Sequence, residues 1–175
     1  MAPTRASLLS VLSFLLLAAL ASASVEEVCK KITTVDHAGV KYDFCVKSLK
    51  ADPSSATADE RGIAVIAGHL GSSKARSTLA KINNLLKTAP KPLSIPLKDC
   101  QELYDESVDK LSAAADAAKA NNYSDANIFF VFGMDTATTC DSGFKEMKLR
   151  SPLAADDNEL FQLSAIGTAI THTGP

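Results

Sequence analysis

The residues whose chemistry is easiest to define are the four cysteines, Cys29, Cys45, Cys100 and Cys140. In an exported chain an even number of cysteines implies two disulfides, and the sequence alone allows three pairings. A zinc site is disfavoured, because no two of these cysteines have the Cys-x-x-Cys spacing typical of zinc ligands. A free reactive thiol is disfavoured as well, because the N-terminal residues 1–23 have the pattern of a secretory signal peptide and thiols are oxidised in the exported compartment.

The other residues that could do chemistry do not form a site at the level of sequence. The three histidines, His37, His69 and His172, lie far apart, and no cysteine or carboxylate stands three or four residues from His69. The acidic run Asp156–Glu159 lacks the alternating ligands and the turn glycine of a calcium loop, so a helix start is favoured there. Motifs for a serine nucleophile, a dinucleotide, a zinc protease or a phosphate loop are absent. The sequence therefore predicts a protein that is not an enzyme and uses no metal or cofactor.

The N-terminus has the pattern of a secretory signal peptide over residues 1–23. Arg5 is followed by the apolar run Leu8–Ala21 and by the small-x-small cleavage pattern Ala21-Ser22-Ala23. A membrane anchor is the alternative, but the run is short for the roughly 30 Å hydrocarbon core of a bilayer. We therefore expect a secreted chain of one domain, residues 24–175, located in the cell wall space, with the vacuole as the alternative and no membrane contact after cleavage.

The charge of the mature chain excludes one broad class of partner. Without Arg5 the chain has 17 basic and 20 acidic residues, a net charge of −3, and no run rich in lysine or arginine. A nucleic-acid-binding domain is expected to carry a basic patch or stripe. We therefore expect no nucleic-acid partner.

Hydrophobic periodicity predicts helices along the whole mature chain. A short helical hairpin is expected over 25–50, with its break at His37-Ala38-Gly39, and a four-helix bundle over 56–171. The fold class is all-α, an antiparallel up-and-down four-helix bundle preceded by the short N-terminal hairpin and held by two disulfides.

The ends of the four bundle helices are predicted from caps and prolines. The first helix is expected to start at a Thr57-x-x-Glu60 capping box, with a kink at Gly71-Ser72-Ser73, and to end near Thr88. The prolines at 90, 92 and 96 mark a linker before a second helix over about 97–120. The third helix is expected from an N-cap at Ser124 to about Asp141, and the last helix to about Ile170 with a frayed tail behind it. The expected core positions of the third helix are Ile128, Val131 and Phe132, with some of Met134, Ala137 and Thr138.

Hairpin geometry bears on the disulfide pairing. Cys29 and Cys45 lie eight residues either side of His37, so they face each other in an antiparallel hairpin and are the expected pair. Cys100 and Cys140 lie at nearly equal distances from a turn at Asn122, with an offset of about one helical turn, so that pair is feasible. Any pairing across the two hairpins would need a more elaborate topology.

Two further features concern modification and ligands. Asn122-Tyr123-Ser124 is the only N-glycosylation sequon of the chain and lies at a predicted helix–helix turn. An apolar ligand tunnel is an alternative to a solid bundle, but long helices and only two bridges disfavour it. The phenylalanines at 129, 130 and 132 are therefore interpreted as core residues.

Motifs around all four cysteines resemble the plant invertase and pectin methylesterase inhibitor family. The resemblance covers almost the whole mature chain and is nearest to pollen-type invertase inhibitors, some of them allergens. The motifs are Val28-Cys29-Lys30-Lys31, Tyr42–Leu49 with Asp52-Pro53, Asp99-Cys100-x-Glu102-x-Tyr104, Thr139–Phe144, Ser151-Pro152-Leu153 and the closing stretch Leu163–Ile170.

This resemblance implies a fold, two disulfides and a class of partner. The fold is a four-helix bundle with an N-terminal hairpin, and the bridges are Cys29–Cys45 and Cys100–Cys140. The partner is an acid invertase or a pectin methylesterase of the cell wall or vacuole, bound one to one.

The resemblance also indicates a candidate contact with the target. Invertase inhibitors of this family carry a Pro-Lys-Phe motif near the start of the third bundle helix, which enters the invertase cleft. The matching positions, counted back from Cys140, are Tyr123, Ser124 and Asp125, so the motif itself is absent. A Ser-Ala-Ala segment common in relatives is also replaced, by Val131-Phe132-Gly133. A glycan on Asn122 would occupy the same place.

The favoured hypothesis is a secreted glycoprotein inhibitor that binds and occludes a plant acid invertase (a β-fructofuranosidase). One alternative is inhibition of a pectin methylesterase. The other is a non-inhibitory secreted family member, allergen-like or defensive, which the missing contact motif supports. Mildly acidic conditions are expected to tune binding through carboxylates and histidines.

Overall fold

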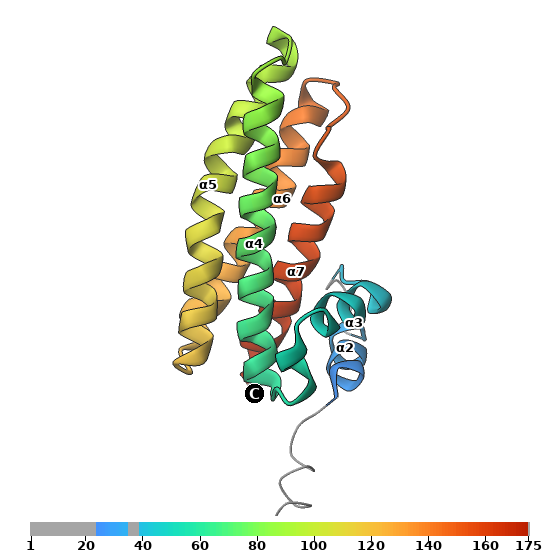
Figure 1. Cartoon of the computed structure of the whole chain (residues 1–175), viewed down its shortest axis with the longest axis vertical. Coiled ribbons are helices and arrows are strands. Elements are labelled where there is room, and N and C mark those ends of the chain that lie inside the picture. The colour runs from blue at the N-terminus through green and yellow to red at the C-terminus, as the bar shows by residue number, and fades with distance from the viewer. Residues whose placement is uncertain (1–23, 35–38, 175) are drawn as a thin grey trace, which may run out of the picture.

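Helices make up nearly all of the part of the chain that the computed structural model describes, residues 24–34 and 39–174 (Figure 1). The elements are α2 (Val25–Thr33), α3 (Tyr42–Lys50), the 3-10 helix η1 (Pro53–Ala56), α4 (Glu60–Leu86), α5 (Lys91–Lys119), α6 (Tyr123–Glu146) and α7 (Ala154–Thr173). Within these two ranges there is no strand, and the predicted all-α fold is confirmed. The predicted signal peptide over 1–23 and part of the predicted hairpin break, His37-Ala38, lie outside the described residues.

The four long helices α4 to α7 run alternately up and down and form the predicted antiparallel bundle (Figure 1). Helix α4 packs against α5 and α7, and α6 packs against the same two helices. Each helix therefore contributes one side to a common core. The largest fully buried side chains of the bundle are Ile63, Ile82, Leu97, Tyr104, Leu111, Phe130, Phe144, Leu153, Leu160, Gln162 and Ile166.

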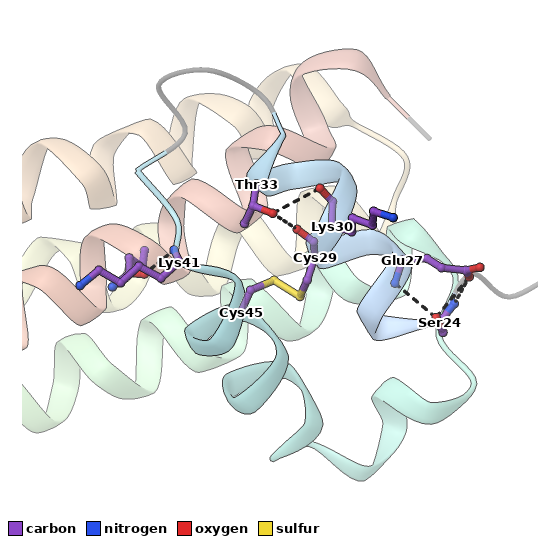
Figure 2. Close-up of a disulfide and its surroundings, with 8 residues drawn as sticks. Ser24, Glu27, Cys29, Lys30, Thr33, Lys41 and Cys45 are labelled. Atoms are coloured by element: carbon purple, nitrogen blue, oxygen red, sulfur yellow. Dashed lines mark hydrogen bonds between the residues drawn. A yellow bond between two sulfur atoms is a disulfide. The ribbon is translucent and has the colours of Figure 1, made fainter.

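The hairpin of α2 and α3 lies beside the lower half of the bundle and packs against α7 and α4 (Figure 1). The Cys29–Cys45 disulfide joins its two helices, and a capping box between Ser24 and Glu27 starts α2 (Figure 2). The chain enters α3 through Gly39, whose φ of +65° favours glycine. A Cβ atom at Gly39 would also lie 2.7 Å from the ring of Phe161.

Two helix starts differ slightly from the prediction. The N-cap of α4 is Asp59, whose carboxylate accepts from the Gly62 N–H at 2.7 Å, and not Thr57. The N-cap of α6 is Asn122, and not Ser124. Each replacement is an Asx residue, and Asn and Asp cap helices at least as well as Ser and Thr.

The proline-rich segment is part of α5 and not a linker. Helix α5 begins at Lys91, so Pro92 occupies its second position, where the backbone N–H has no partner within the helix. Pro96 lies inside the helix and is buried. A proline there removes one helical hydrogen bond, so its burial offsets part of that cost. Sequence rules alone favoured a break because they weigh the lost bond and cannot include the packing.

Helix α4 runs as one helix from Glu60 to Leu86, and its glycine at position 68 serves contact with α5. A Cβ atom at Gly68 would lie 2.9 Å from the backbone nitrogen of Ala115 and 3.0 Å from the carbonyl oxygen of Leu111. Gly68 therefore allows the backbones of α4 and α5 to approach closely.

The last two helices are longer than predicted. Helix α6 continues to Glu146, past the predicted end at Asp141, and α7 continues to Thr173. Thr171, predicted to start a frayed tail, is buried and donates to the Gly167 carbonyl at 2.8 Å. None of the described helices combines the length and apolar content that crossing a membrane requires.

Candidate functional site

The predicted contact residues lie at the turn between α5 and α6, at the same end of the bundle as the C-terminus (Figure 1). Asn121 adopts a left-handed backbone conformation with φ of 60°, and the Asn122 N–H donates to the Ala117 carbonyl at 2.9 Å. Asparagine tolerates this conformation better than most residues, because its short side chain bonds locally. The two asparagines therefore end one helix and start the next within two residues.

The first turn of α6 presents Tyr123, Ser124 and Asp125. Ser124 and Asp125 are exposed, while Tyr123 is half-buried and its hydroxyl donates to the side-chain oxygen of Asn121 at 2.9 Å. Asp125 is held by Asn122, whose amide nitrogen donates to the carboxylate at 2.6 Å. The three residues thus form one ordered surface turn.

Beyond this turn, α6 carries exposed apolar side chains on the side that was predicted to be core. Ile128 is 61% exposed and Val131 38% exposed, so the predicted inward placement of Ile128 and Val131 is wrong. Phe132, also predicted to face inward, is only half-buried. Positions 128, 131 and 132 share one side of a helix because neighbours three and four residues apart stand above each other. We call this set, Ile128, Val131 and Phe132, the α6 apolar face.

The inward side of α6 is made by a different series of residues. They recur every three or four positions and are Ala126, Phe130, Gly133, Thr136, Ala137, Cys140 and Phe144. The stretch from Ile128 to Phe132 is apolar at every position, so its periodicity does not fix which side faces inward. Cys140 could have fixed it, because a cysteine bridged to α5 must face α5, and counting back from it in steps of three or four reaches Thr136, Gly133 and Phe130.

A lysine from α5 lies against the same side of α6. The Lys110 ammonium is 5.7 Å from the ring centre of Phe129 and 5.8 Å from that of Phe132, within the range of cation–π attraction. It also lies 3.5 Å from Glu106, four residues earlier on α5. The half-buried rings are therefore covered by a charged side chain, while Ile128 and Val131 remain exposed.

A groove between α5 and α6 continues this side of the bundle toward the other end. It has a volume of about 440 Å³, and its floor includes the Cys100–Cys140 disulfide. Asp99 and Glu146 line it, and Glu102 and Glu106 line an adjoining hollow. The α5–α6 side of the molecule is thus apolar near the Asn121–Asn122 turn and acidic farther along.

The acidic residues at the start of α7 have structural partners. Asp156 accepts hydrogen bonds from Lys74 at 2.7 Å and Lys81 at 2.6 Å, both from α4. Burial disfavours its charged form, but the two ammonium groups outweigh this and hold the pKa of Asp156 below its usual value. The neighbouring Glu159 lies 2.7 Å from Lys74 as well. This cluster ties α7 to α4.

Asp157 is buried, at 4% exposure, and accepts a hydrogen bond of 2.7 Å from the Tyr104 hydroxyl of α5. Its second carboxylate oxygen has no hydrogen-bond partner among the described residues. Burial raises the pKa of Asp157 to about 7, although the Tyr104 hydroxyl lowers it in part. Burial and the carboxylate also raise the pKa of Tyr104 far above its usual value. The pair joins α5 to α7 inside the bundle.

The remaining sequence candidates do not gather into a further site. His69 and His172 are exposed on different helices, and His37 lies outside the described residues. The ranges 24–34 and 39–174 contain no group of three or more His, Cys, Asp or Glu residues that could hold a metal ion. Both disulfides, Cys29–Cys45 and Cys100–Cys140, are present in the structure.

Comparisons with known proteins agree with the resemblance drawn from the sequence. Residues 23–170 match the family model described as "Plant invertase/pectin methylesterase inhibitor". A "Putative invertase inhibitor" from Platanus acerifolia is 39% identical over 160 residues, which are 90% of this chain and 89% of that protein. The "Cell wall / vacuolar inhibitor of fructosidase 2" from Arabidopsis thaliana is 33% identical over 109 residues, 61% of each chain. A "Pectinesterase inhibitor" from Actinidia deliciosa is 26% identical over 122 residues, 69% of this chain and 62% of that one.

One solved structure supports the fold. The crystal structure of a mutant form of a pectin methylesterase inhibitor from Arabidopsis superposes with a TM-score of 0.71 at 19% identity. The match covers 87% of this chain and 99% of that one. Because the family model matches residues 23–170, the chain belongs to the plant invertase/pectin methylesterase inhibitor family.

Proposed function

We propose that the mature chain, residues 24–175, is a secreted protein without catalytic activity that binds a plant acid invertase one to one. Bound in this way, it blocks access of the sugar substrate to the invertase cleft. The relatives named as inhibitors of invertase or of fructosidase support this choice of target. The cell wall and vacuolar location in the name of the Arabidopsis relative supports secretion.

The observation that carries the proposal is the exposure of Ile128 and Val131 directly beyond the Tyr123–Asp125 turn. Large apolar side chains grouped on one helix face and rimmed by polar residues are typical of protein-binding surfaces. The Cys100–Cys140 disulfide joins α6 to α5 and the Asn122 side chain caps the start of α6, so this surface is held in place before binding, which lowers the entropy cost of association. We therefore assign docking to the turn and the α6 apolar face together.

A pectin methylesterase is the second candidate target. The relative from Actinidia deliciosa, named as a pectinesterase inhibitor, supports it. So does the acidic groove beside α5 and α6, lined by Asp99 and Glu146, because it would complement a basic target surface.

The test compares two matched substitutions of exposed isoleucines. Ile128→Asp places a charge on the proposed docking surface, while Ile95→Asp does the same near the opposite end of the bundle, where Ile95 is 48% exposed. In the complex, Ile128→Asp removes an isoleucine from the interface and buries a charge there. Together these two effects should weaken inhibition by at least about tenfold. Ile95→Asp should leave the inhibition constant within about twofold of wild type, since Ile95 lies outside the proposed contact.

The inhibition constants are measured on disulfide-bonded protein, with sucrose hydrolysis by an acid invertase and demethylation by a pectin methylesterase as separate assays. A titration of active enzyme should end at one inhibitor per enzyme. Inhibition of the pectin methylesterase alone would replace the first target by the second. Inhibition of neither enzyme by a correctly folded protein would favour a non-inhibitory family member.

A further inference from the structure

The sequon Asn122-Tyr123-Ser124 overlaps the proposed docking turn, Tyr123–Asp125, and its asparagine has a structural role of its own. The Asn122 side-chain oxygen accepts from the Asp125 N–H and so caps α6. The amide nitrogen, the atom to which an N-glycan is joined, points to the exposed Asp125 carboxylate. The side-chain oxygen of Asn122 therefore caps α6, while its amide nitrogen bonds to the Asp125 carboxylate.

Attachment of a sugar to this nitrogen is compatible with the fold. The glycosidic bond replaces one of its two hydrogens, so one N–H remains for Asp125 and the carbonyl oxygen remains for the cap. Asn122 is exposed, and the turn that carries it connects two helices at the end of the bundle. The cap and the glycan can therefore be present together.

The same position brings a glycan close to the docking surface. Residues 122, 125, 129 and 132 follow at intervals of three or four, so they lie on one side of α6. At 1.5 Å per residue, Ile128 is only about 9 Å farther along the helix than Asn122. A branched chain of several sugars is longer than this distance and, attached to Asn122, would stand between the α6 apolar face and a docking enzyme.

We propose that Asn122 carries an N-linked glycan and that this glycan weakens docking of the target enzyme at the adjacent turn. Occupancy of the sequon then divides the secreted protein into a strongly inhibitory form without glycan and a weakly inhibitory form with it. Only the weakened docking rests on the proposed function, because attachment of the glycan is measured by mass and does not depend on inhibition.

Attachment is tested by expressing the full chain through a plant secretory pathway and measuring the mass of the secreted protein. Ser124→Thr keeps the sequon and Ser124→Ala removes it, so the two variants form a matched pair at one exposed position. The expected result is a glycan mass on wild type and on Ser124→Thr, and none on Ser124→Ala. A single unglycosylated mass for all three proteins would overturn the assignment.

The effect on docking is tested on wild type alone, so that both forms share one sequence. Lectin chromatography separates the glycosylated from the unglycosylated form, and the inhibition constant of each is measured against the same enzyme. The glycosylated form should inhibit at least about tenfold more weakly, and trimming its glycan to a single sugar should restore most of the difference. Equal inhibition constants would overturn the docking effect. Absence of inhibition by either form would overturn the proposed function and the docking effect with it, whereas the mass would still decide the glycan.

Discussion

Replacement of Asp157 by asparagine should remove most of the pH dependence of stability between pH 5 and pH 8. Asp157 is buried between α5 and α7, and one of its oxygens accepts from the Tyr104 hydroxyl. Asparagine has nearly the same shape and can still accept that hydrogen bond, but it cannot ionise. The substitution therefore isolates the cost of the buried charge.

The magnitude follows from the pKa of Asp157, which is about 7 in the folded chain compared with 3.8 for an unperturbed carboxyl group. Because the folded state holds the proton more tightly, Asp157 stabilises the fold fully below pH 3.8 and loses this contribution as the pH rises through 7. Between pH 5 and pH 8 the free energy of unfolding of wild type should fall by about 2–3 kcal/mol from this group. For a domain of this size that corresponds to a decrease in Tm of about 5–12 °C.

The groups that face Asp157 come from all four bundle helices. Asp141 of α6 and Asp156 of α7 raise its pKa, while the Tyr104 hydroxyl of α5 and Lys81 of α4 lower it. The contribution of Asp156 to stability changes with pH in the opposite direction, since its own pKa is lowered. Its contribution is present above pH 3.8 and is lost only at more acidic pH, outside the measured window.

The assay is thermal and urea unfolding of wild type and Asp157→Asn at several values from pH 5 to pH 8. The buried amide nitrogen of asparagine has its own desolvation cost, which shifts the stability of the variant by the same amount at every pH. Only the difference between the two proteins in the slope of unfolding free energy against pH therefore reports the ionisation of the Asp157 carboxyl group. Parallel curves for the two proteins would refute the argument, because Asp157 would then keep an ordinary pKa despite its burial.

Three further predictions concern packing, ion pairing and the longer disulfide. Gly167→Ala should destabilise the fold by about 1–3 kcal/mol, since a Cβ there overlaps the Phe130 ring, whereas Gly143→Ala, where the nearest atom is 3.8 Å away, should stabilise it by about 0.5–1 kcal/mol. Urea unfolding measures both changes, and equal signs would contradict the packing argument. Asp156→Ala should cost about 1–3 kcal/mol in the same assay, because it leaves the Lys74 ammonium, only 17% exposed, with Glu159 alone; a change within about 0.5 kcal/mol, as expected for an exposed ion pair, would refute burial as the cause. Removal of the Cys100–Cys140 bridge, both cysteines to serine, should cost about 4 kcal/mol by loop entropy, compared with about 3 kcal/mol for the shorter loop of the other bridge. A larger loss from the shorter loop, measured by urea unfolding, would contradict that order.

The number, direction and approximate ends of the bundle helices could be predicted because they depend on local patterns. Apolar residues at helical spacing and breaks near Asn122 and Pro90 mark the helices without knowledge of their neighbours. Short connections then make adjacent helices antiparallel. The errors at the starts of α4 and α6 were small for the same reason, since Asp59 and Asn122 lie within two residues of the predicted caps. The start of α5 at Lys91, well before the predicted 97, was missed because it depends on the packing of the proline segment.

The sides of α6 could not be predicted from periodicity. Its segment from Ile128 to Phe132 is apolar throughout, so every orientation would bury some of these side chains. The side of α6 that faces the core is set by contacts with residues distant in the sequence: Phe130 packs against Gly167 of α7, and Cys140 is bridged to Cys100 of α5. The exposed α6 apolar face, which carries the proposed function, follows from that choice.

By itself the sequence determined a disulfide-bonded helical bundle, its sequon and its resemblance to a family of inhibitors, because these depend on residue types and on short spacings. Only the tertiary structure decided that Asp157 is a buried partner of Tyr104 and that Ile128 and Val131 face solvent. Burial and pKa depend on residues that are distant in the chain, 53 positions apart for Tyr104 and Asp157, and no local pattern encodes such a contact.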